Sequence, residues 1–449
     1  MAESVDVVVV GMGVGGEAVA GSLAQAGLSV VGVESNLLGG ECPYWACIPS
    51  KMMLRAGETL AEGRRIPIMA GDSAVTPQWE PVARRIREEA TTDWDDQVAV
   101  DRFVGQGGRF VRGRGRITAP GEVSVGEQVF HAQRGIVIAS GTRPAAPPIG
   151  GLDGTPYWTN HEAIETESAP ESLVVLGGGA VGVELAQVFA RFGAAVTILE
   201  MAERLLPAEE PEAGELLGEA LTRDGITVRT SETASSVRHD GAFTLELDGG
   251  GSVGADRLLV ATGRRANVAE VGAGVVGIDE NAAWVPVDEQ LRAAPGVWAV
   301  GDVTGKGLFT HVATYQAGIA AADILGQPGF VADYSALPRA TFTDPEIGGV
   351  GLTEAQARER GLRVRTVTKG LSARGFIHKA GGDGFIKLVA DTERDVLVGA
   401  TSTGPVGGEV LGMLSLAVHS QIPIAQMRTM IYAYPTFHRA VHDALGDLP

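Results

Sequence analysis

Two stretches of the chain show the same order of apolar and polar positions. Each has a run of apolar residues of strand length, then a Gly-x-Gly-x-x-Gly turn, a helix-like stretch, another glycine and a second apolar run that ends in an acid. The first copy begins at Val5 and the second at Ser172. Short continuous apolar runs are typical of buried strands in a parallel sheet. The repeat therefore predicts two domains with the same strand–turn–helix–strand start.

The glycines and the terminal acid have one spacing in both copies. The first copy has Gly11, Gly13 and Gly16 followed by Glu34, the second has Gly177, Gly179 and Gly182 followed by Glu200, and each acid lies 23 residues after its first glycine. In such a motif the first glycine permits a tight turn, the second lets the backbone approach a pyrophosphate, and the third lets the helix pack on the strand. The acid accepts hydrogen bonds from ribose hydroxyls. The alternative is that the glycines serve only tight packing. The acid that both copies share at one spacing favours two dinucleotide-binding sites instead.

Later apolar runs complete the domain organisation. The runs 136–141 and 258–263 both end in glycine and are followed by arginine, and we interpret them as crossings between the two nucleotide domains. A third run, 297–303, contains Gly301 and Asp302. From about Ala336 strands and helices alternate with no glycine fingerprint, which predicts an α+β domain for association. We predict a first domain of 1–148 and 266–332, a second of 149–265 and a third of 333–449.

Composition narrows the class of protein. The 449 residues allow about three domains of roughly 150 residues. A net charge of −19 argues against binding to a nucleic-acid backbone. Two cysteines are too few for a disulfide-stapled secreted fold or a four-cysteine zinc site, and we expect no metal site. The apolar stretch Val5 to Val33 is interrupted by Asp6, Glu17 and glycines, so we expect strands and a helix rather than a membrane segment. A cytoplasmic protein with no membrane partner is expected.

The two cysteines lie together after the first nucleotide motif. Residues 39–51 read G-G-E-C-P-Y-W-A-C-I-P-S-K, with Cys42 and Cys47 five positions apart. An ideal helix would separate them by roughly 8–9 Å, but a disulfide needs Cα atoms within roughly 7 Å. The turn must be distorted, and Pro43 and Pro49 are suited to cause this. The position favours a redox-active pair at the reactive end of a dinucleotide cofactor, over a structural disulfide or two inert thiols.

Together these motifs resemble the flavoprotein disulfide reductases, the class I pyridine nucleotide-disulfide oxidoreductase family. That family includes dihydrolipoamide dehydrogenase, glutathione reductase and mercuric reductase. The resemblance covers essentially the whole chain: both fingerprints, C-x-x-x-x-C-I-P-S-K, A-T-G-R-R, G-D-V and the C-terminal domain. It implies an α/β fold with two Rossmann-like domains, for FAD and for NAD(P), a C-terminal α+β dimerisation domain, and a homodimer.

The resemblance assigns residues to the two cofactors. For FAD these are Gly11, Gly13, Gly16, Glu34, Lys51, Gly115, Ser140, Gly141, Asp302, Thr310 and His311. For the nicotinamide they are Gly177, Gly179, Gly182, Glu200 and Gly263. Asp302 would hold the ribityl chain, Thr310 and His311 would lie near the flavin, and Gly115 near the adenosine. Glu200 favours NADH over NADPH because a carboxylate repels a 2′-phosphate, although nearby Arg204 leaves room for NADPH.

The resemblance also assigns catalytic roles. Cys47 would be the thiol in charge-transfer contact with the flavin, and Cys42 the outer thiol that attacks the substrate. Lys51 would pair with Glu184 beside flavin N5. Electrons would pass from the nicotinamide to FAD, to the Cys42–Cys47 disulfide and then to an acceptor, in a direction that can reverse.

The C-terminal motif departs from the family pattern. Dithiol-specific members carry His-Pro-Thr with a Glu three residues after the Thr, and this His–Glu pair, supplied across the dimer interface, serves the outer thiol. Here Tyr434 and Arg439 stand in the two places. A Tyr, with a pKa of about 10, suits proton transfer at neutral pH less than a His of about 6.5. His438 is a candidate displaced base, on a helix that Thr436 would cap; the alternative is a surface histidine beside His442.

A second departure lies between the cysteines, where small or aliphatic residues are usual. Tyr44 and Trp45 stand there, and they either wall the disulfide cleft or pack against a neighbouring domain. Mercury reduction is not expected, because the C-terminal cysteine pair and the N-terminal metal-binding domain of mercuric reductases are absent.

Three functions stay open. The favoured one is an NAD(P)H-dependent disulfide reductase or dithiol dehydrogenase. The second is a flavoprotein that reduces a quinone, a metal ion or another non-disulfide acceptor. The third is a redox-sensing flavoprotein with little turnover, which the second dinucleotide fold argues against.

Overall fold

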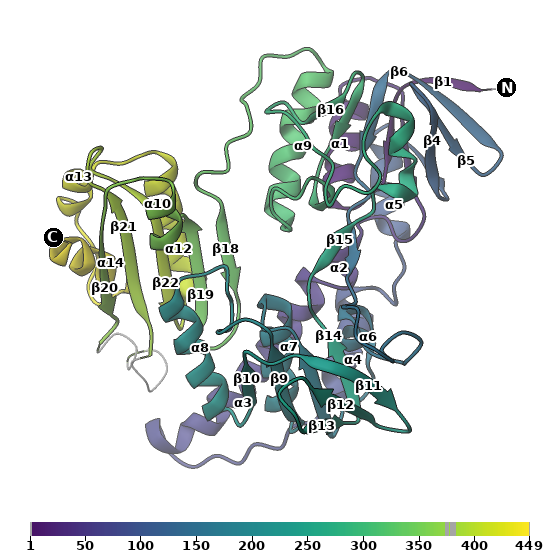
Figure 1. Cartoon of the computed structure of the whole chain (residues 1–449). Helices are drawn as coiled ribbons and strands as arrows, with labels where there is room; N and C mark the ends of the chain where they lie inside the picture. The colour runs from purple at the N-terminus through teal and green to yellow at the C-terminus, as the bar shows by residue number, and fades with distance from the viewer. Residues whose placement is uncertain (1, 373–376, 378–382, 449) are drawn as a thin grey trace. The chain divides into compact units, whose positions relative to one another are not determined.

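The computed structural model describes residues 2–372, 377 and 383–448. It divides into two compact units (Figure 1). The first unit contains 1–50, 84–145 and 263–333, and the second contains 51–83, 146–262 and 334–449. Residues 51–83 thus group with the second unit, although the predicted division kept 1–148 together. The predicted domain limits themselves stay a prediction.

The first unit is built on a mostly parallel sheet with the order β16-β17-β6-β1-β2-β3, to which β5 and β4 are attached through β6. Its central strand, β1, pairs in parallel with β2 on one side and β6 on the other. A small pair, β7 and β15, lies outside this sheet. The elements are β1 (Glu3–Val10), α1 (Val14–Gln25), β2 (Val30–Glu34), α2 (Glu41–Tyr44), η1 (Ile86–Ala90), α5 (Gln97–Gly105), β3 (Arg109–Arg112), β4 (Gly115–Ala119), β5 (Glu122–Val125), β6 (Gln128–Ile138), β7 (Thr142–Pro144), β15 (Arg264–Ala266), η2 (Ala269–Val271), η3 (Ala273–Val276), β16 (Arg292–Ala294), β17 (Val297–Ala299), η4 (Asp302–Thr304) and α9 (Thr310–Ile324).

The apolar run of β1 is buried on both faces of this sheet. Val8 and Val10 join one core cluster, and Val7 and Val9 join the other. The second cluster includes residues of α1 and α9, which lie side by side (Figure 1). Burial on both faces explains why the strand shows a continuous apolar run rather than alternation.

The second unit contains a parallel sheet, β10-β9-β8-β14, a three-stranded antiparallel sheet, β11-β12-β13, and a five-stranded antiparallel sheet, β18-β19-β22-β21-β20. Two helices, α3 (Cys47–Met69) and α4 (Glu80–Arg85), begin in one unit and end in the other. The remaining elements are α6 (Asn160–Glu165), β8 (Ser172–Leu176), α7 (Ala180–Arg191), β9 (Ala195–Glu200), α8 (Pro211–Arg223), β10 (Thr227–Thr230), β11 (Ala234–His239), β12 (Phe243–Leu247), β13 (Ser252–Ala255), β14 (Arg257–Val260), β18 (Pro338–Thr341), β19 (Glu346–Gly351), α10 (Glu354–Glu359), β20 (Val364–Gly370), β21 (Phe385–Asp391), β22 (Val396–Gly404), α12 (Gly407–His419), α13 (Ile424–Arg428) and α14 (Phe437–Asp447).

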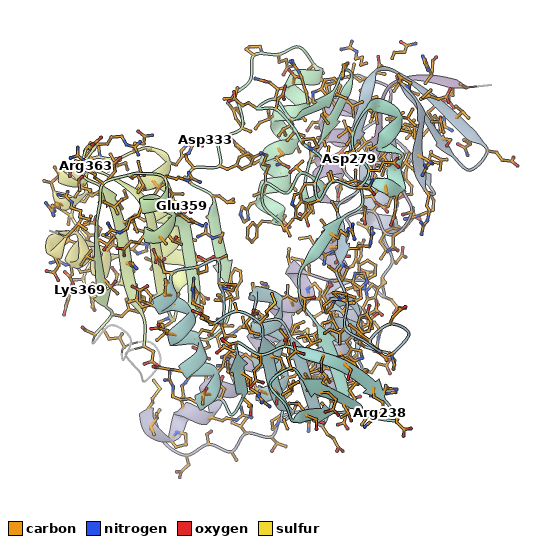
Figure 2. All side chains as sticks on the ribbon, viewed as in Figure 1. Arg238, Asp279, Asp333, Glu359, Arg363 and Lys369 are labelled. Atoms are coloured by element: carbon orange, nitrogen blue, oxygen red, sulfur yellow. The ribbon has the colours of Figure 1, made fainter. Side chains whose placement is uncertain are left out.

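The five-stranded sheet forms the C-terminal α+β part of the chain. The helices α12 and α14, yellow in Figure 1, pack on its strands and share one core cluster with them. Its edge strands are β18 and β20, and Figure 2 shows Arg363 and Lys369 near the two ends of β20. Charged side chains on an edge strand oppose pairing with another sheet.

The two nucleotide folds share their strand order. In the first, β6 and β2 flank β1; in the second, β14 and β9 flank β8. The internal repeat is therefore a repeat of topology, and it places both glycine turns at the carboxyl end of a central strand.

Candidate functional site

The first glycine turn leaves no room for side chains at two positions. Gly11 has φ +96°, and a Cβ there would lie 2.3 Å from the Ala139 carbonyl oxygen. A Cβ on Gly16 would lie 2.0 Å from the Gly11 carbonyl oxygen. Both glycines are thus required by close backbone packing between strand, turn and helix.

The acid at the end of β2 is fixed by the backbone of the turn. One carboxylate oxygen of Glu34 accepts from the Met12 N–H at 2.8 Å, and the other accepts from the Asn36 N–H at 2.8 Å. The carboxylate therefore lies directly beside the glycine turn, where a ribose of a dinucleotide would be recognised.

The second turn repeats this construction. A Cβ on Gly177 would lie 2.4 Å from the Ala261 carbonyl oxygen, and one on Gly182 would lie 2.0 Å from the Gly177 carbonyl oxygen. Glu200 accepts from the Gly178 N–H at 2.5 Å and from the Ala202 N–H at 2.6 Å. The two sites are built in the same way, residue for residue.

Both turns fit a pyrophosphate. Gly13 and Gly179 are the N-caps of α1 and α7, and neither supplies a side chain to cap the helix. A Cβ on Gly179 would meet no protein atom within 4 Å, and one on Gly13 only the Gly40 Cα at 3.9 Å. The second glycine of each motif therefore faces space rather than packing, and the helix N–H groups beside it suit an anion.

The cysteines lie on two helices with a break between them. Cys42 is on α2, and Cys47 is the first residue of α3. The chain leaves helical geometry at Trp45 (φ −135°, ψ 10°), so the distortion expected between the cysteines is present. Pro49 lies in the first turn of α3, where a missing N–H costs nothing. It starts a helix rather than distorting one.

The two cysteines are present as thiols and contact each other. The hydrogen bond between them and the burial of Cys42 raise the pKa of the Cys42 thiol, and Thr310 acts in the opposite direction. Oγ1 of Thr310 lies 3.3 Å from Sγ of Cys47.

The aromatic residues between the cysteines are buried. Tyr44 is 6% exposed and Trp45 is 7% exposed, and their rings lie 5.8 Å apart. The Tyr44 hydroxyl donates to the Leu38 carbonyl at 3.3 Å, and burial raises the pKa of this hydroxyl. The Leu38 N–H in turn donates to Asp96 at 2.6 Å. The two rings are thus buried within the first unit, and their packing against a neighbouring domain stays a prediction.

A polar cluster surrounds Asp302. The Thr142 hydroxyl lies 3.2 Å from the Asp302 carboxylate, and Arg264 donates to Thr142 at 2.7 Å. Arg264 also pairs with Glu41 at 3.4 Å. Burial raises the pKa of Asp302, although Arg264 and Thr142 act against this. A carboxylate held in this way can accept hydrogen bonds from a polyhydroxyl chain.

Four more of the residues predicted for FAD, Ser140, Gly141, Gly115 and His311, also lie in the first unit, whereas Lys51 belongs to the second. Ser140 donates to the Asn267 carbonyl at 3.1 Å, and Gly141 has φ +62° with open space at its Cβ position. A Cβ on Gly115 would meet the Val10 side chain at 3.0 Å. His311 stacks on Phe309, with ring centroids 5.1 Å apart.

The second unit holds the predicted ion pair. Lys51 Nζ lies 2.8 Å from a carboxylate oxygen of Glu184, whose side chain is only 7% exposed. The other Glu184 oxygen accepts from the Phe342 N–H at 2.8 Å. Gly263, predicted for the nicotinamide, belongs to the first unit and has φ +125° with open space at its Cβ position.

At the C-terminus, Tyr434 is 79% exposed. Thr436 caps α14, since its hydroxyl accepts from the Arg439 N–H at 3.3 Å, so the predicted cap is present and His438 lies in the first turn. Arg439 pairs with Asp443 at 3.3 Å. The His442 ring packs on Tyr432, with centroids 5.0 Å apart.

Three residues that contact the candidate site were not predicted from the sequence. Thr142, Asp96 and Phe342 each contact a predicted residue or its loop. No motif marks them, because each partner lies far away in the sequence. Among the described residues, no group of three or more His, Cys, Asp or Glu side chains could hold a metal ion, and no helix has the length and apolarity needed to cross a bilayer.

Comparison with known proteins gives one family over almost the whole chain. The pyridine nucleotide-disulphide oxidoreductase family model matches residues 5–317, and its dimerisation-domain model matches residues 337–445. A mercuric reductase from Acidithiobacillus ferrooxidans is 34% identical over 95% of this chain and 79% of its own length. A dihydrolipoyl dehydrogenase from Thermus scotoductus is 33% identical over 99% of this chain and 97% of its own length.

Solved structures share the fold. The HOCl-induced flavoprotein disulfide reductase RclA from Escherichia coli superposes with a TM-score of 0.85 at 25% identity, covering 99% of both chains. LpdA from Mycobacterium tuberculosis superposes with a TM-score of 0.87 at 22% identity, also covering 99% of both chains.

Proposed function

Because this chain belongs to the pyridine nucleotide-disulphide oxidoreductase family, we propose that it passes electrons from NADH to a disulfide substrate through Cys42 and Cys47. As a member it is an FAD-dependent oxidoreductase that uses a pyridine nucleotide and a redox-active disulfide. The physiological acceptor, the preference for NADH and the role of each residue are the proposal.

The contact of the two thiols with Thr310 carries this proposal. Cys47 has a hydroxyl 3.3 Å from its sulfur, which can donate to a thiolate, whereas the hydrogen bond with Cys47 and burial raise the pKa of Cys42. When Cys42 attacks a disulfide as a thiolate, it forms a mixed disulfide and releases one thiol; Cys47 then attacks Cys42 and releases the second thiol. The substrate gains two electrons, and the enzyme is left with the Cys42–Cys47 disulfide.

FAD, when bound, supplies two-electron transfer between the nicotinamide and the Cys42–Cys47 pair. We assign its pyrophosphate to the first glycine turn and its adenosine ribose to Glu34. The buried carboxylate of Asp302, held by Thr142, would accept from the ribityl hydroxyls. Ser140, Gly141, Gly115, Thr310 and His311 complete the set proposed for this cofactor.

Lys51 and Glu184 are proposed as the charged pair that serves the flavin. The Lys51 ammonium lies 2.8 Å from a Glu184 carboxylate that is almost fully buried. Such a cation stabilises negative charge that develops on a reduced ring.

NADH is the proposed reductant. Glu200 presents a carboxylate at the second turn, and Glu203 follows it within the same loop. One guanidinium nitrogen of Arg204 donates to the Pro207 and Glu209 carbonyl oxygens. A 2′-phosphate at the second turn would meet the negative charge of Glu200.

We also propose a homodimer through residues 337–445, the part that matches the dimerisation domain. The exposed Tyr434 belongs to this part, and the family relation would place it near the outer thiol of the other subunit. A tyrosine hydroxyl can donate a hydrogen bond to that thiol, and His438 remains the alternative proton carrier.

The departure from the family pattern at the C-terminus supports a second candidate function. Because Tyr434 and Arg439 replace the usual His–Glu pair, no thiol-specific base stands at the expected positions. A quinone, a metal ion or another non-disulfide acceptor would not need one.

The decisive experiment is anaerobic titration of the holoenzyme with NADH, followed by acceptor assays. A long-wavelength charge-transfer band is expected in wild type, and its absence would remove the disulfide mechanism. Cys42→Ser should abolish reduction of lipoamide, glutathione disulfide and other small disulfides but spare quinone reduction. Equal loss of both activities would contradict the proposed division of roles between the cysteines.

A further inference from the structure

Three side chains on one face of α7 bond to a single turn of the C-terminal part. Glu184, Gln187 and Arg191 are three and four residues apart, so they lie on one side of the helix. All three bond to the turn between β18 and β19, residues 342–345. The helix that carries the second fingerprint at its N-terminus is therefore bonded to this turn from Glu184 to Arg191, and Gln187 and Arg191 also bond to Asp224.

Asp344 makes most of the contacts between this turn and the helices. Its N–H donates to Gln187 at 2.8 Å, and its carbonyl accepts from the Gln187 amide at 3.0 Å. Its carboxylate accepts from Arg191 at 2.9 Å and from Arg65 of α3 at 2.5 Å. Arg191 is only 5% exposed, so this is a buried charged contact that holds α3, α7 and the turn together.

At the start of the turn, Phe342 contacts both members of the charged pair. Its N–H donates to one oxygen of Glu184 at 2.8 Å, while Lys51 Nζ binds the other oxygen at 2.8 Å. The Lys51 ammonium also lies over the Phe342 ring, 4.8 Å from its centroid. Phe342 thus meets the carboxylate with its backbone and the ammonium with its side chain.

The lysine needs such support more than the glutamate does. The Lys51 side chain is 38% exposed, whereas that of Glu184 is 7% exposed. An exposed lysine has a flexible stem and strong hydration, and one ion pair fixes its position poorly. An aromatic face held by a fastened turn offers a second, directional contact.

We propose that Phe342 is a positioning residue for the redox reaction, holding the Lys51 ammonium on Glu184 through its ring. This inference rests on the proposed function, in which the Lys51–Glu184 pair serves the flavin. It adds that the C-terminal part sets the position of that pair, so that the turn between β18 and β19 is part of the catalytic apparatus.

The first test measures the position of Lys51 without turnover. Holoenzyme is acetylated briefly with N-hydroxysuccinimidyl acetate, and the rate at Lys51 is read by mass spectrometry against exposed Lys306. Phe342→Leu should raise the Lys51 rate about threefold to tenfold, since an aromatic–cation contact of ordinary strength is lost. Phe342→Tyr, which keeps the ring, should restore the wild-type rate, and Phe330→Leu, a change to an exposed phenylalanine elsewhere, should leave it unchanged.

The second test measures the reaction. In anaerobic stopped-flow mixing with NADH, Phe342→Leu should slow flavin reduction about threefold to tenfold, with an unchanged NADH dissociation constant and with rescue by Phe342→Tyr. Phe342→Met removes the ring with a flexible side chain and provides the same comparison should the leucine variant fold poorly.

The outcomes separate the inference from the proposed function. If Lys51→Met slows flavin reduction but both ring-less variants leave Lys51 acetylation at the wild-type rate, the inference is wrong and the proposed role of Lys51 stands. If the ring-less variants expose Lys51 but neither they nor Lys51→Met alters flavin reduction, the proposed role of Lys51 fails and the positioning role fails with it. Exposure of Lys51 together with slower reduction supports both.

Discussion

In the first unit, Oγ1 of Thr310 lies 3.3 Å from Sγ of Cys47, although the two residues are 263 positions apart in the chain. Thr310 begins α9 and Cys47 begins α3, so the contact joins the starts of two helices. A hydroxyl beside a sulfur stabilises the thiolate if it donates. Thr310 also opposes the rise in the pKa of Cys42 that its hydrogen bond with Cys47 and its burial cause.

Thr310→Val should weaken this stabilisation. A hydrogen bond to a charged group contributes about 1.5–3 kcal/mol, which corresponds to about one to two pH units. The pH at which the charge-transfer absorbance of the NADH-reduced enzyme appears should rise by that amount, because the thiolate loses a donor. Thr310→Ser keeps the hydroxyl and should behave as wild type; an unchanged pH profile for the valine variant would show that Thr310 does not donate to the sulfur.

Glu200→Ala should change the choice of nicotinamide. The carboxylate accepts from the Gly178 and Ala202 N–H groups, and its proposed role is to accept from a ribose hydroxyl of the nicotinamide. Its loss should raise KM for NADH about tenfold, from a lost charged hydrogen bond, and lower KM for NADPH because the repulsion disappears. Steady-state kinetics with both nucleotides measure this.

Glu34 provides the matched control for that experiment, because it makes the same backbone contacts in the first turn. Glu34→Ala should weaken retention of FAD without altering the ratio of the two nicotinamide KM values. If the Glu200 variant kept the wild-type ratio, the assignment of NADH to the second turn would be wrong.

Restoring the family dyad should reveal whether proton transfer limits the reaction. Tyr434→His with Arg439→Glu recreates the usual residues, while the Thr436 cap of α14 is retained. The substitution removes the Arg439–Asp443 pair, a half-exposed contact within one helix that contributes about 0.5 kcal/mol. We expect disulfide reduction to rise at least about tenfold, with a new pH dependence near pH 6.5, as a general base would give.

The same variant separates the two candidate functions. Quinone reduction should not change, since it needs no thiol base. If disulfide reduction stayed at the wild-type rate while the variant folded normally, the absent dyad would not be what limits this enzyme, and a non-disulfide acceptor would become the favoured substrate.

The glycine turns could be predicted because their requirements are local. A Cβ on Gly11 or Gly177 collides with a neighbouring strand in any chain that makes this turn, so the sequence alone shows the constraint. The repeat also predicts the shared strand order. The Lys51–Glu184 pair is different, since 133 residues separate the partners and only the family resemblance indicated it.

Other features depend on packing that no local pattern reports. The burial of Tyr44 and Trp45 is one such feature. In the sequence, Phe342 is one apolar residue beside a strand. Its proposed role depends on the contact of its ring with Lys51 and of its N–H with Glu184. Asp96 likewise acts through the Leu38 backbone, 58 positions away.

Lys387 of β21 is buried among three glutamates in the second unit. Its ammonium lies 3.0 Å from Glu210, 2.7 Å from Glu212 and 3.3 Å from Glu354, and its side chain is 5% exposed. Burial opposes the charged form, but hydrogen bonds with Glu212 and Glu210 outweigh it and raise the pKa of Lys387. A raised pKa means that the stabilisation is fully present below the unfolded value of about 10.4 and is lost as the pH rises through the folded value.

Lys387→Met should lower the free energy of unfolding by about 3–5 kcal/mol at neutral pH, because Glu210, only 3% exposed, loses its cation and keeps only the hydrogen bond from the Glu354 N–H. A buried carboxylate that has lost its cation binds a proton more readily, so the loss should shrink as the pH falls and Glu210 becomes neutral. Urea unfolding at pH 7.5 and at pH 4.5 measures both effects.

Lys369→Met, which removes the exposed pair with Asp447, is the control and should cost less than about 1 kcal/mol. Adding Glu210→Gln to Lys387→Met should recover part of the loss at pH 7.5, because it removes the stranded charge. A loss of equal size at both pH values would show that the methionine fails by packing and that the buried charges contribute nothing.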